Sequence, residues 1–107
     1  PWLHLNEVFW DAEAGRQVWA EIAFKTPTHL HALTVYENPR LPQSWPSEGL
    51  VQVWDEALKK WQTVSFGLFL NGPTNTYPLN LKRVSRLRYV PWNSYYRNFY
   101  TSAIEVR

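Results

Sequence analysis

Cysteine is absent from this sequence of 107 residues. Its absence excludes disulfides, thiolate catalysis and cysteine-based zinc sites, and it leaves the redox compartment open. The four glycines form no phosphate-binding loop. No apolar run approaches the roughly 18 residues of a transmembrane helix, and no signal peptide is visible. Methionine is absent too, so we expect a chain that begins Pro-Trp to be excised or processed from a larger protein with further domains.

What the sequence has instead is a large share of aromatic residues. Hydrophobic residues make up 45% of the chain and the formal net charge is +2, which excludes the disordered class and favours one globular domain. The aromatic share is 17%, with seven Trp and six Tyr, and this is more than a core of this size requires. Some of the rings must therefore face outward.

Strands rather than helices are predicted throughout the chain. The eight prolines are spread over its length and leave few windows for an uninterrupted helix. Alternation and the enrichment in β-branched and aromatic residues predict about seven strands, at the spacing of an all-β antiparallel sandwich. The predicted strands are 19–24, 30–37, 50–55, 61–66, 76–81, 84–90 and 101–107. Residues 1–17 show no clear period, and we interpret them as a lead-in with a turn at 11–15.

The segment VWDEALKKW at 53–61 has helical as well as strand features. Apolar residues fall at i, i+4 and i+7 from Trp54, and Asp55 is a suitable N-cap. A helix would also pair Glu56 with Lys60. The segment is too short for a stable isolated helix, and its flanks alternate as strands. We therefore predict a hairpin whose loop makes one helical turn.

The loops of such a sandwich divide between its two ends if each connection reverses the chain. The short charged turns 25–29, 56–60 and 82–83 then share one end, and the long aromatic segments 1–17, 38–49, 67–75 and 91–100 share the other. Recognition sites of sandwich folds are usually built from long loops at one end of a rigid scaffold. The aromatic end is therefore the predicted binding end.

Binding by flat rings with a few polar partners suits carbohydrates, because sugar C–H faces stack on Trp or Tyr while the hydroxyls need Arg or Asn. Tyr89, Phe99 and Tyr100 are the better core candidates of the aromatic run at 89–100. Two alternatives stay open: the rings only cap the sandwich against water, or they contact a protein or a membrane. The candidate ligand-binding residues are Asn38, Arg40, Trp45, Trp92, Asn93, Tyr95, Tyr96 and Arg97.

No catalytic constellation can be assembled from the sequence, which argues against an enzyme. His29 and His31 would project to the same face of a strand, a geometry that binds metals, but such a pair is more often surface or packing. No carboxylate pair at glycosidase spacing can be identified. The basic residues at 82–88 are interpreted as a solvated strand edge rather than a nucleic-acid site.

The succession of these strands resembles the discoidin-like domains, also called galactose-binding-like or coagulation factor type C domains. In that pattern a Trp-containing strand leads through a turn into a valine-rich strand. A hairpin with a Trp after its turn, an arginine-rich strand and a closing I-x-E-h-like strand follow. Residues 19–24 match the first strand, Trp61 the hairpin tryptophan, Arg88 the arginine strand and 104–106 the close. The resemblance covers residues 18–107 and rests on pattern.

The resemblance implies a jelly roll that serves as a non-catalytic accessory module, most often for glycans or polysaccharides and sometimes for lipid head groups or proteins. It implies an extracellular, cell-surface or periplasmic location, and ligand loops at 38–49 and 91–100. A structural or protein-docking domain of a larger secreted protein is the alternative, and a membrane-surface binder is a third. The family's calcium-binding opening is not recognisable. Glu105 stands where the late calcium ligand is expected, and Asp11 or Glu13 would have to replace the loop ligand.

Overall fold

The computed structural model describes residues 2–11, 19–68, 72–92 and 98–107, and most of them lie in strands. Neighbouring strands pair antiparallel in the order β1-β6-β2-β5-β3-β4. The elements are β1 (Trp2–Asp11), β2 (Ala20–Glu37), the 3-10 turn η2 (Pro42–Ser44), β3 (Glu48–Asp55), β4 (Lys60–Leu68), β5 (Thr74–Trp92) and β6 (Asn98–Val106).

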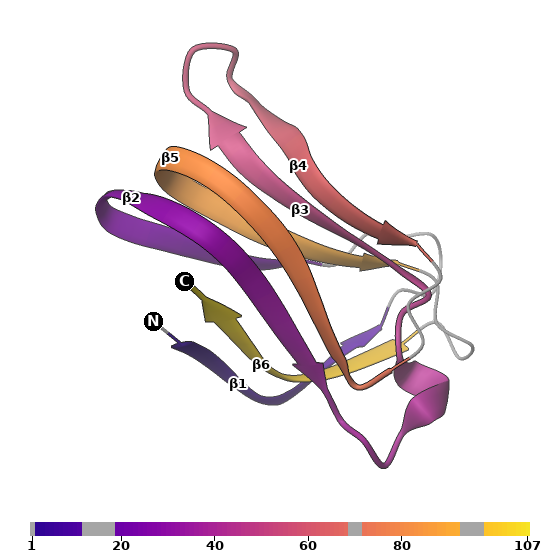
Figure 1. Ribbon diagram of the computed structural model, residues 1–107. Helices are drawn as coiled ribbons and strands as arrows, with labels where there is room; N and C mark the ends of the chain where they lie inside the picture. Colours follow the sequence, from indigo (N-terminus) through magenta and orange to yellow (C-terminus); the bar gives the residue numbers. More distant parts are fainter. Residues whose placement is uncertain (1, 12–18, 69–71, 93–97) are drawn as a thin grey trace.

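Two long strands turn this sheet into two layers. β2 has 18 residues and β5 has 19, and both fold over at one end of the molecule (Figure 1). The first part of β2 pairs with the last part of β5, as in Ala20 opposite Tyr89, and the second part pairs with the first, as in Thr34 opposite Thr76. One layer therefore contains β3 and β4 beside one half of each long strand, and the other contains β1 and β6 beside the other half.

The predicted positions of the strands are confirmed, but two predicted turns are wrong. Residues 20–24 and 30–37 belong to one bent strand, β2, with Trp19 directly before it, and residues 76–81 and 84–90 belong to β5. Pairing shifts register between Ala23 and Ala32, and such irregularities bend a strand without ending it. Pro27 lies in the bend, where the pairing is irregular. Its lack of a backbone N–H therefore removes no hydrogen bond from a regular ladder.

The core fills the space between the two layers. Inward-facing residues alternate along the strands, so that Leu33, Val35, Leu87 and Ile104 are fully buried. Tyr89 is also buried, which confirms its assignment to the core. The side chains of Phe99 and Tyr100, the other two core candidates, lie outside the described residues.

The hairpin between β3 and β4 has the predicted form. Asp55 Oδ1 accepts a hydrogen bond of 3.0 Å from the backbone N–H of Leu58, which is the capping contact of a single helical turn. Lys59 has a φ of 53°, a left-handed conformation that ends the turn. Glu56 pairs with Lys59 and not with Lys60, because the turn stops one residue before Lys60 begins β4.

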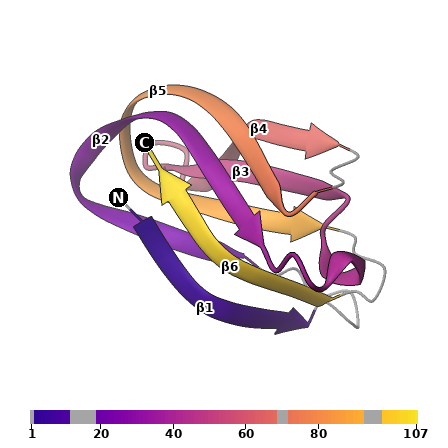
Figure 2. The same ribbon diagram turned by 60° about the horizontal axis from the view of Figure 1, so that its bottom comes forward.

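Residues 2–11, for which no strand is predicted, form β1 at the edge of the sheet beside β6. The pairing runs from Trp2 opposite Glu105 to Asp11 opposite Asn98, with an irregularity between His4 and Val8. The start of β1 and the end of β6 therefore lie side by side (Figure 2). This long-range pairing leaves no alternating pattern in the sequence because the register breaks in the middle of the strand.

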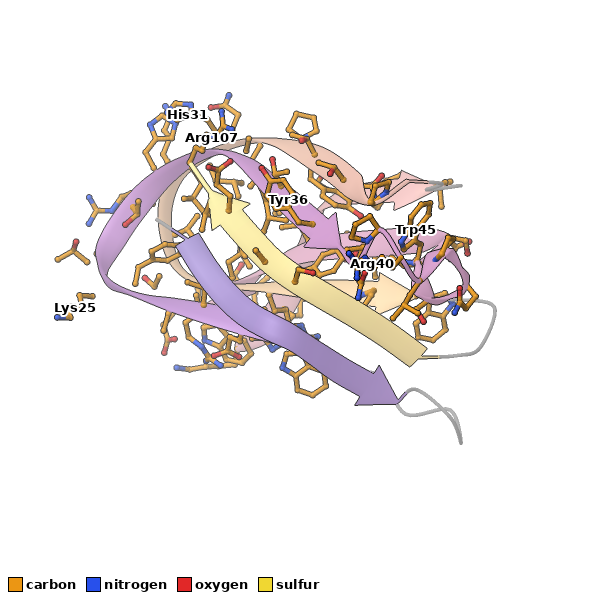
Figure 3. The ribbon with its side chains drawn as sticks, turned by 90° about the horizontal axis from the view of Figure 1, so that it is seen from below. Lys25, His31, Tyr36, Arg40, Trp45 and Arg107 are labelled. Atoms are coloured by element: carbon orange, nitrogen blue, oxygen red, sulfur yellow. The ribbon has the colours of Figure 1, made fainter. Side chains whose placement is uncertain are left out.

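Segments 25–29 and 38–47 lie at opposite ends of the sandwich, as the parity of the loops predicts, but residues 2–11, which parity placed at one end, run along the layer as β1. Lys25 lies at the bend of β2 and His31 lies beside Arg107, whereas Arg40 and Trp45 lie at the opposite end beside η2 (Figure 3). We refer to the end that carries residues 38–47 as the loop end.

Candidate ligand-binding site

The connection from β2 to β3 is closed by its own hydrogen bonds. Asn38 Oδ1 accepts from the backbone N–H of Arg40 at 2.9 Å, and Trp45 Nε1 donates to the backbone oxygen of Asn38 at 2.9 Å. The N–H of Leu41 donates to the same oxygen at 3.2 Å. The polar atoms of Asn38 and Trp45 named here therefore hold the loop together, whereas Arg40 is exposed at its tip.

A pocket of about 230 Å³ lies where β3, β4 and β5 reach the loop end. Glu48 is paired with both Leu68 and Trp92, so these three residues form one row across three strands. The side chain of Trp92 is 47% exposed. The lining residues are Glu48, Leu50, Gly67, Leu68 and Trp92.

The pocket faces away from the core. Gly49, between Glu48 and Leu50, points to the interior, where an added Cβ would overlap Tyr77 Oη. Because side chains alternate along a strand, Glu48 and Leu50 project to the outer face of this layer. An indole, a carboxylate and aliphatic groups thus meet in an open depression, which offers a stacking surface and hydrogen-bond acceptors to a polyhydroxylated ligand.

The remaining predicted ligand residues, Asn93, Tyr95, Tyr96 and Arg97, lie outside the described residues. They directly follow Trp92 at the end of β5 and precede β6. Their assignment to the site stays a prediction.

Sequence reasoning missed Glu48, Leu50, Gly67 and Leu68 as individual site residues. Glu48 lies in the segment 38–49, and Gly67 and Leu68 lie in 67–75, both of which were assigned to the binding end. What the sequence did not reveal is the pairing of Glu48 with Leu68 and Trp92, because register depends on contacts between distant parts of the chain.

A buried carboxyl group lies directly behind the loop. Glu37, the last residue of β2, is 3% exposed, and burial raises its pKa from 4.5 to about 8. Thr101 Oγ1 donates to the two carboxylate oxygens at 3.0 and 3.2 Å, which offsets part of this rise in pKa. The group is therefore held mainly in its neutral form at pH 7.

Glu105, the expected late calcium ligand, and Asp11, one of its two candidate loop partners, do not come together. Asp11 and Glu105 lie at opposite ends of the β1–β6 pair, and at about 3.3 Å per residue this separates them by roughly 20 Å. Glu105 Oε1 accepts from Arg107 Nε at 2.9 Å and from Nη2 at 2.7 Å, so a guanidinium already holds this carboxylate. Glu13 lies outside the described residues.

The two strand histidines stack on one another at the bend end. The ring centroids of His29 and His31 are 4.3 Å apart, as expected for residues on the same side of a strand. In the described part of the chain, no three His, Cys, Asp or Glu side chains gather closely enough to hold a metal ion. The pair is thus a surface ring contact.

Comparison with known proteins shows the fold. No protein-family model matches the sequence, and no curated protein is similar to it in sequence. Solved structures do match. The chain superposes on CpGH89CBM32-5 from Clostridium perfringens, in complex with GalNAc-β-1,3-galactose, with a TM-score of 0.70 and 8% identity, over 94% of this chain and 76% of that one.

Two other structures are similar. Chitosan-binding module 1 of a chitosanase/glucanase from Paenibacillus sp. IK-5 matches with a TM-score of 0.67 and 13% identity, over 97% of this chain and 96% of that one. SpGH29 matches with a TM-score of 0.72 and 18% identity, over 92% of this chain but only 21% of that one. The fold is the discoidin-like β-sandwich of family 32 carbohydrate-binding modules, which confirms the predicted fold class. No helix in the described residues has the length and apolar character of a membrane span.

Proposed function

We propose that this chain is a non-catalytic carbohydrate-binding module that holds a glycan in the pocket beside Trp92. The observation that carries the proposal is a half-exposed indole facing a carboxylate, Glu48, at the loop end. The fold supports it, because modules of the same fold are described with GalNAc-containing glycans and with chitosan.

The contacts suggest a division of roles within the site. The Trp92 ring provides the surface for a sugar C–H face, and the Glu48 carboxylate accepts hydrogen bonds from sugar hydroxyls. Arg40, at the tip of the neighbouring loop, is a donor for ring or hydroxyl oxygens. Asn38 and Trp45 also stabilise this loop through their hydrogen bonds, and their contact with the ligand stays a prediction.

A binding role fits the titratable groups at this end better than an enzymatic one. Glu37 has the raised pKa of a general acid. Its carboxyl group is buried and hydrogen-bonded to Thr101, so a substrate in the pocket does not reach it. We expect the protein to act outside the cytoplasm, at the cell surface or in the periplasm, as glycan-binding modules of secreted hydrolases do.

A titration monitored by tryptophan fluorescence tests this function. Galactose, GalNAc and chitosan oligosaccharides are added to the protein, and we expect at least one to change the emission with saturation. Trp92→Ala should weaken that binding by about tenfold or more, since the loss of one stacking contact of about 1.4 kcal/mol has that effect. Trp92→Phe should keep part of the affinity because it keeps an aromatic face.

The matched control is Leu58→Ala, which removes another exposed apolar side chain, at the opposite end. It should bind as the wild type does. If Trp92→Ala binds every sugar as tightly as the wild type, the pocket is not the binding site.

A second candidate function is docking to another domain of a parent protein. Phe66 and Leu68 are 62% and 55% exposed, and they flank the pocket on the same face of β4. An apolar strip of this kind also suits a protein contact. Under this alternative no sugar would bind, and Phe66→Ser would raise the solubility of the isolated domain.

A further inference from the structure

The outer face of the β3–β4 layer carries a ladder of arginine and tryptophan side chains. The Arg86 guanidinium lies 5.0 Å from the ring centroid of Trp54 and 5.1 Å from that of Trp61. The Arg88 guanidinium lies 4.4 Å from Trp61 and 5.0 Å from Trp19. All four contacts fall within the range of cation–π attraction. The ladder therefore runs from Trp19, directly before β2, across β5 to β3 and β4.

These side chains face solvent and not the core. Leu87 and Tyr89 are buried, so the alternation of β5 directs Arg86 and Arg88 to the outside. Trp19 is 46% exposed. The ladder is separate from the pocket, since Arg88 precedes Trp92 by four residues, or about 13 Å along a strand.

The two arginines differ in how their charge is balanced. Arg86 Nε and Nη2 donate to the two carboxylate oxygens of Glu21, both at 3.2 Å. Among the described residues, Arg88 donates through Nε alone, at 2.7 Å, to the neutral amide oxygen of Gln52. In the described part of the chain no carboxylate pairs with Arg88. Desolvation lowers its pKa, which Glu21 offsets only in part.

Arg88 is also held in place before any ligand arrives. Gln52 fixes its Nε, and Gln52 Nε2 in turn donates to Thr63 Oγ1 at 3.0 Å. The Trp61 and Trp19 rings restrict the guanidinium plane. Little side-chain freedom is left to lose on binding, which favours affinity. No described residue accepts from the terminal N–H groups, which form a fork that matches a carboxylate or a sulfate.

We propose that this face, centred on Arg88 between Trp19 and Trp61, is a second binding site that takes an acidic polysaccharide. Its carboxylate or sulfate group would receive the Arg88 terminal N–H groups, and a sugar ring next to it would lie against the exposed Trp19 indole. This site is distinct from the pocket at Trp92 and does not depend on the function proposed for that pocket.

Affinity electrophoresis with three polysaccharides of one backbone tests the inference. Carboxymethyl-dextran, dextran sulfate and neutral dextran are each cast in native gels, and the retardation of the whole chain is measured. We expect at least one of the acidic polymers to retard the wild type, and the polymer that does so identifies the charged group. Arg88→Gln should weaken this binding by about tenfold or more, and Arg88→Lys should restore only part of it, because an ammonium lacks the planar fork.

The matched control is Arg83→Gln, which removes the same charge from an exposed position at the bend of β5. It should change the retardation by less than about twofold. Thermal melting shows whether each variant is folded, and Trp19→Ala gives a second test that leaves the buried core intact. Three results would each overturn the proposal. They are an equal loss of binding in Arg83→Gln and Arg88→Gln, retardation by neutral dextran equal to that by the acidic polymers, and binding of single-stranded DNA as tight as that of the acidic polymers. A failure of sugars to bind at Trp92 would not overturn this proposal, because the two sites are independent.

Discussion

Trp19 and Trp92 are exposed to almost the same extent, 46% and 47%, and lie on the same outer face, but their neighbours differ. The Arg88 guanidinium lies against the Trp19 ring, whereas Trp92 borders an open pocket with a carboxylate and aliphatic groups. Exposure alone therefore does not reveal what an aromatic residue does. The surroundings of Trp19 suit an anionic ligand that pairs with the neighbouring arginine. The surroundings of Trp92 suit a neutral sugar ring that stacks on an indole with no cation over it among the described residues.

The largest expected effect is on stability and comes from Glu37, whose carboxyl group lies behind the loop end and not behind the bend end. Its pKa in the folded chain is about 8 against 4.5 for an ordinary glutamate, so the folded state keeps a proton that the unfolded state releases between these values. The contribution of Glu37 to the free energy of unfolding is therefore fully present below pH 4.5 and is lost as the pH rises through 8. The slope is at most about 1.4 kcal/mol per pH unit. Chemical denaturation at several pH values measures this slope.

Two variants sharpen the interpretation of that slope. Glu37→Gln should flatten it, because the amide does not titrate. Thr101→Val should shift it to higher pH, because the hydroxyl bond that favours the ionised form is lost. A Glu37→Gln variant with the same slope as the wild type would show that another group is responsible.

The next effect concerns the scaffold under the pocket. An alanine at Gly49 would overlap Tyr77 Oη and lie 3.0 Å from Tyr89 Cε1, so we expect Gly49→Ala to cost about 1–3 kcal/mol of folding free energy. Tyr77 Oη is buried and has no hydrogen-bond partner among the described residues. Tyr77→Phe should therefore be nearly neutral alone and should recover part of the loss in the double variant. A double-mutant cycle measured by denaturation gives the coupling.

The smallest effect compares the two tryptophans directly. Trp19→Ala should lower the free energy of unfolding by about 0.5–1 kcal/mol, the value of one exposed cation–π contact. Trp92→Ala should cost less, because no cation lies over its ring in the described part of the chain. Equal losses in urea denaturation would remove the distinction drawn between the two settings.

The positions of the strands were predictable because each long strand alternates between a buried and an exposed face. What could not be predicted was continuity: the bend of β2 around Pro27 looks like a turn in the sequence, although the pairing with β5 resumes beyond it. β1 escaped prediction for a related reason, since its pairing with β6 is interrupted between His4 and Val8.

The candidate site could be predicted as a region of the chain and only partly as individual residues. Long aromatic segments indicated the loop end, and Trp92 indeed lines a pocket there. The roles of Asn38 and Trp45 depend on the hydrogen bonds that close their loop, and the role of Glu48 depends on register. Neither is encoded in local sequence. Arg88 matched the resemblance pattern, but the sequence could not show that Glu21 forms its ion pair with Arg86, which leaves Arg88 without a carboxylate partner among the described residues.

The continuity of β2 and β5 has a consequence for how such a domain can diversify. At the bend end both strands pass from one layer to the other within the hydrogen-bonded sheet, so an inserted residue there would disturb the pairing of both layers. The connection after Glu37 closes on itself by local bonds and can be replaced without disturbing a strand. Grafting new loops to change ligand preference should therefore succeed at the loop end and fail at the bend.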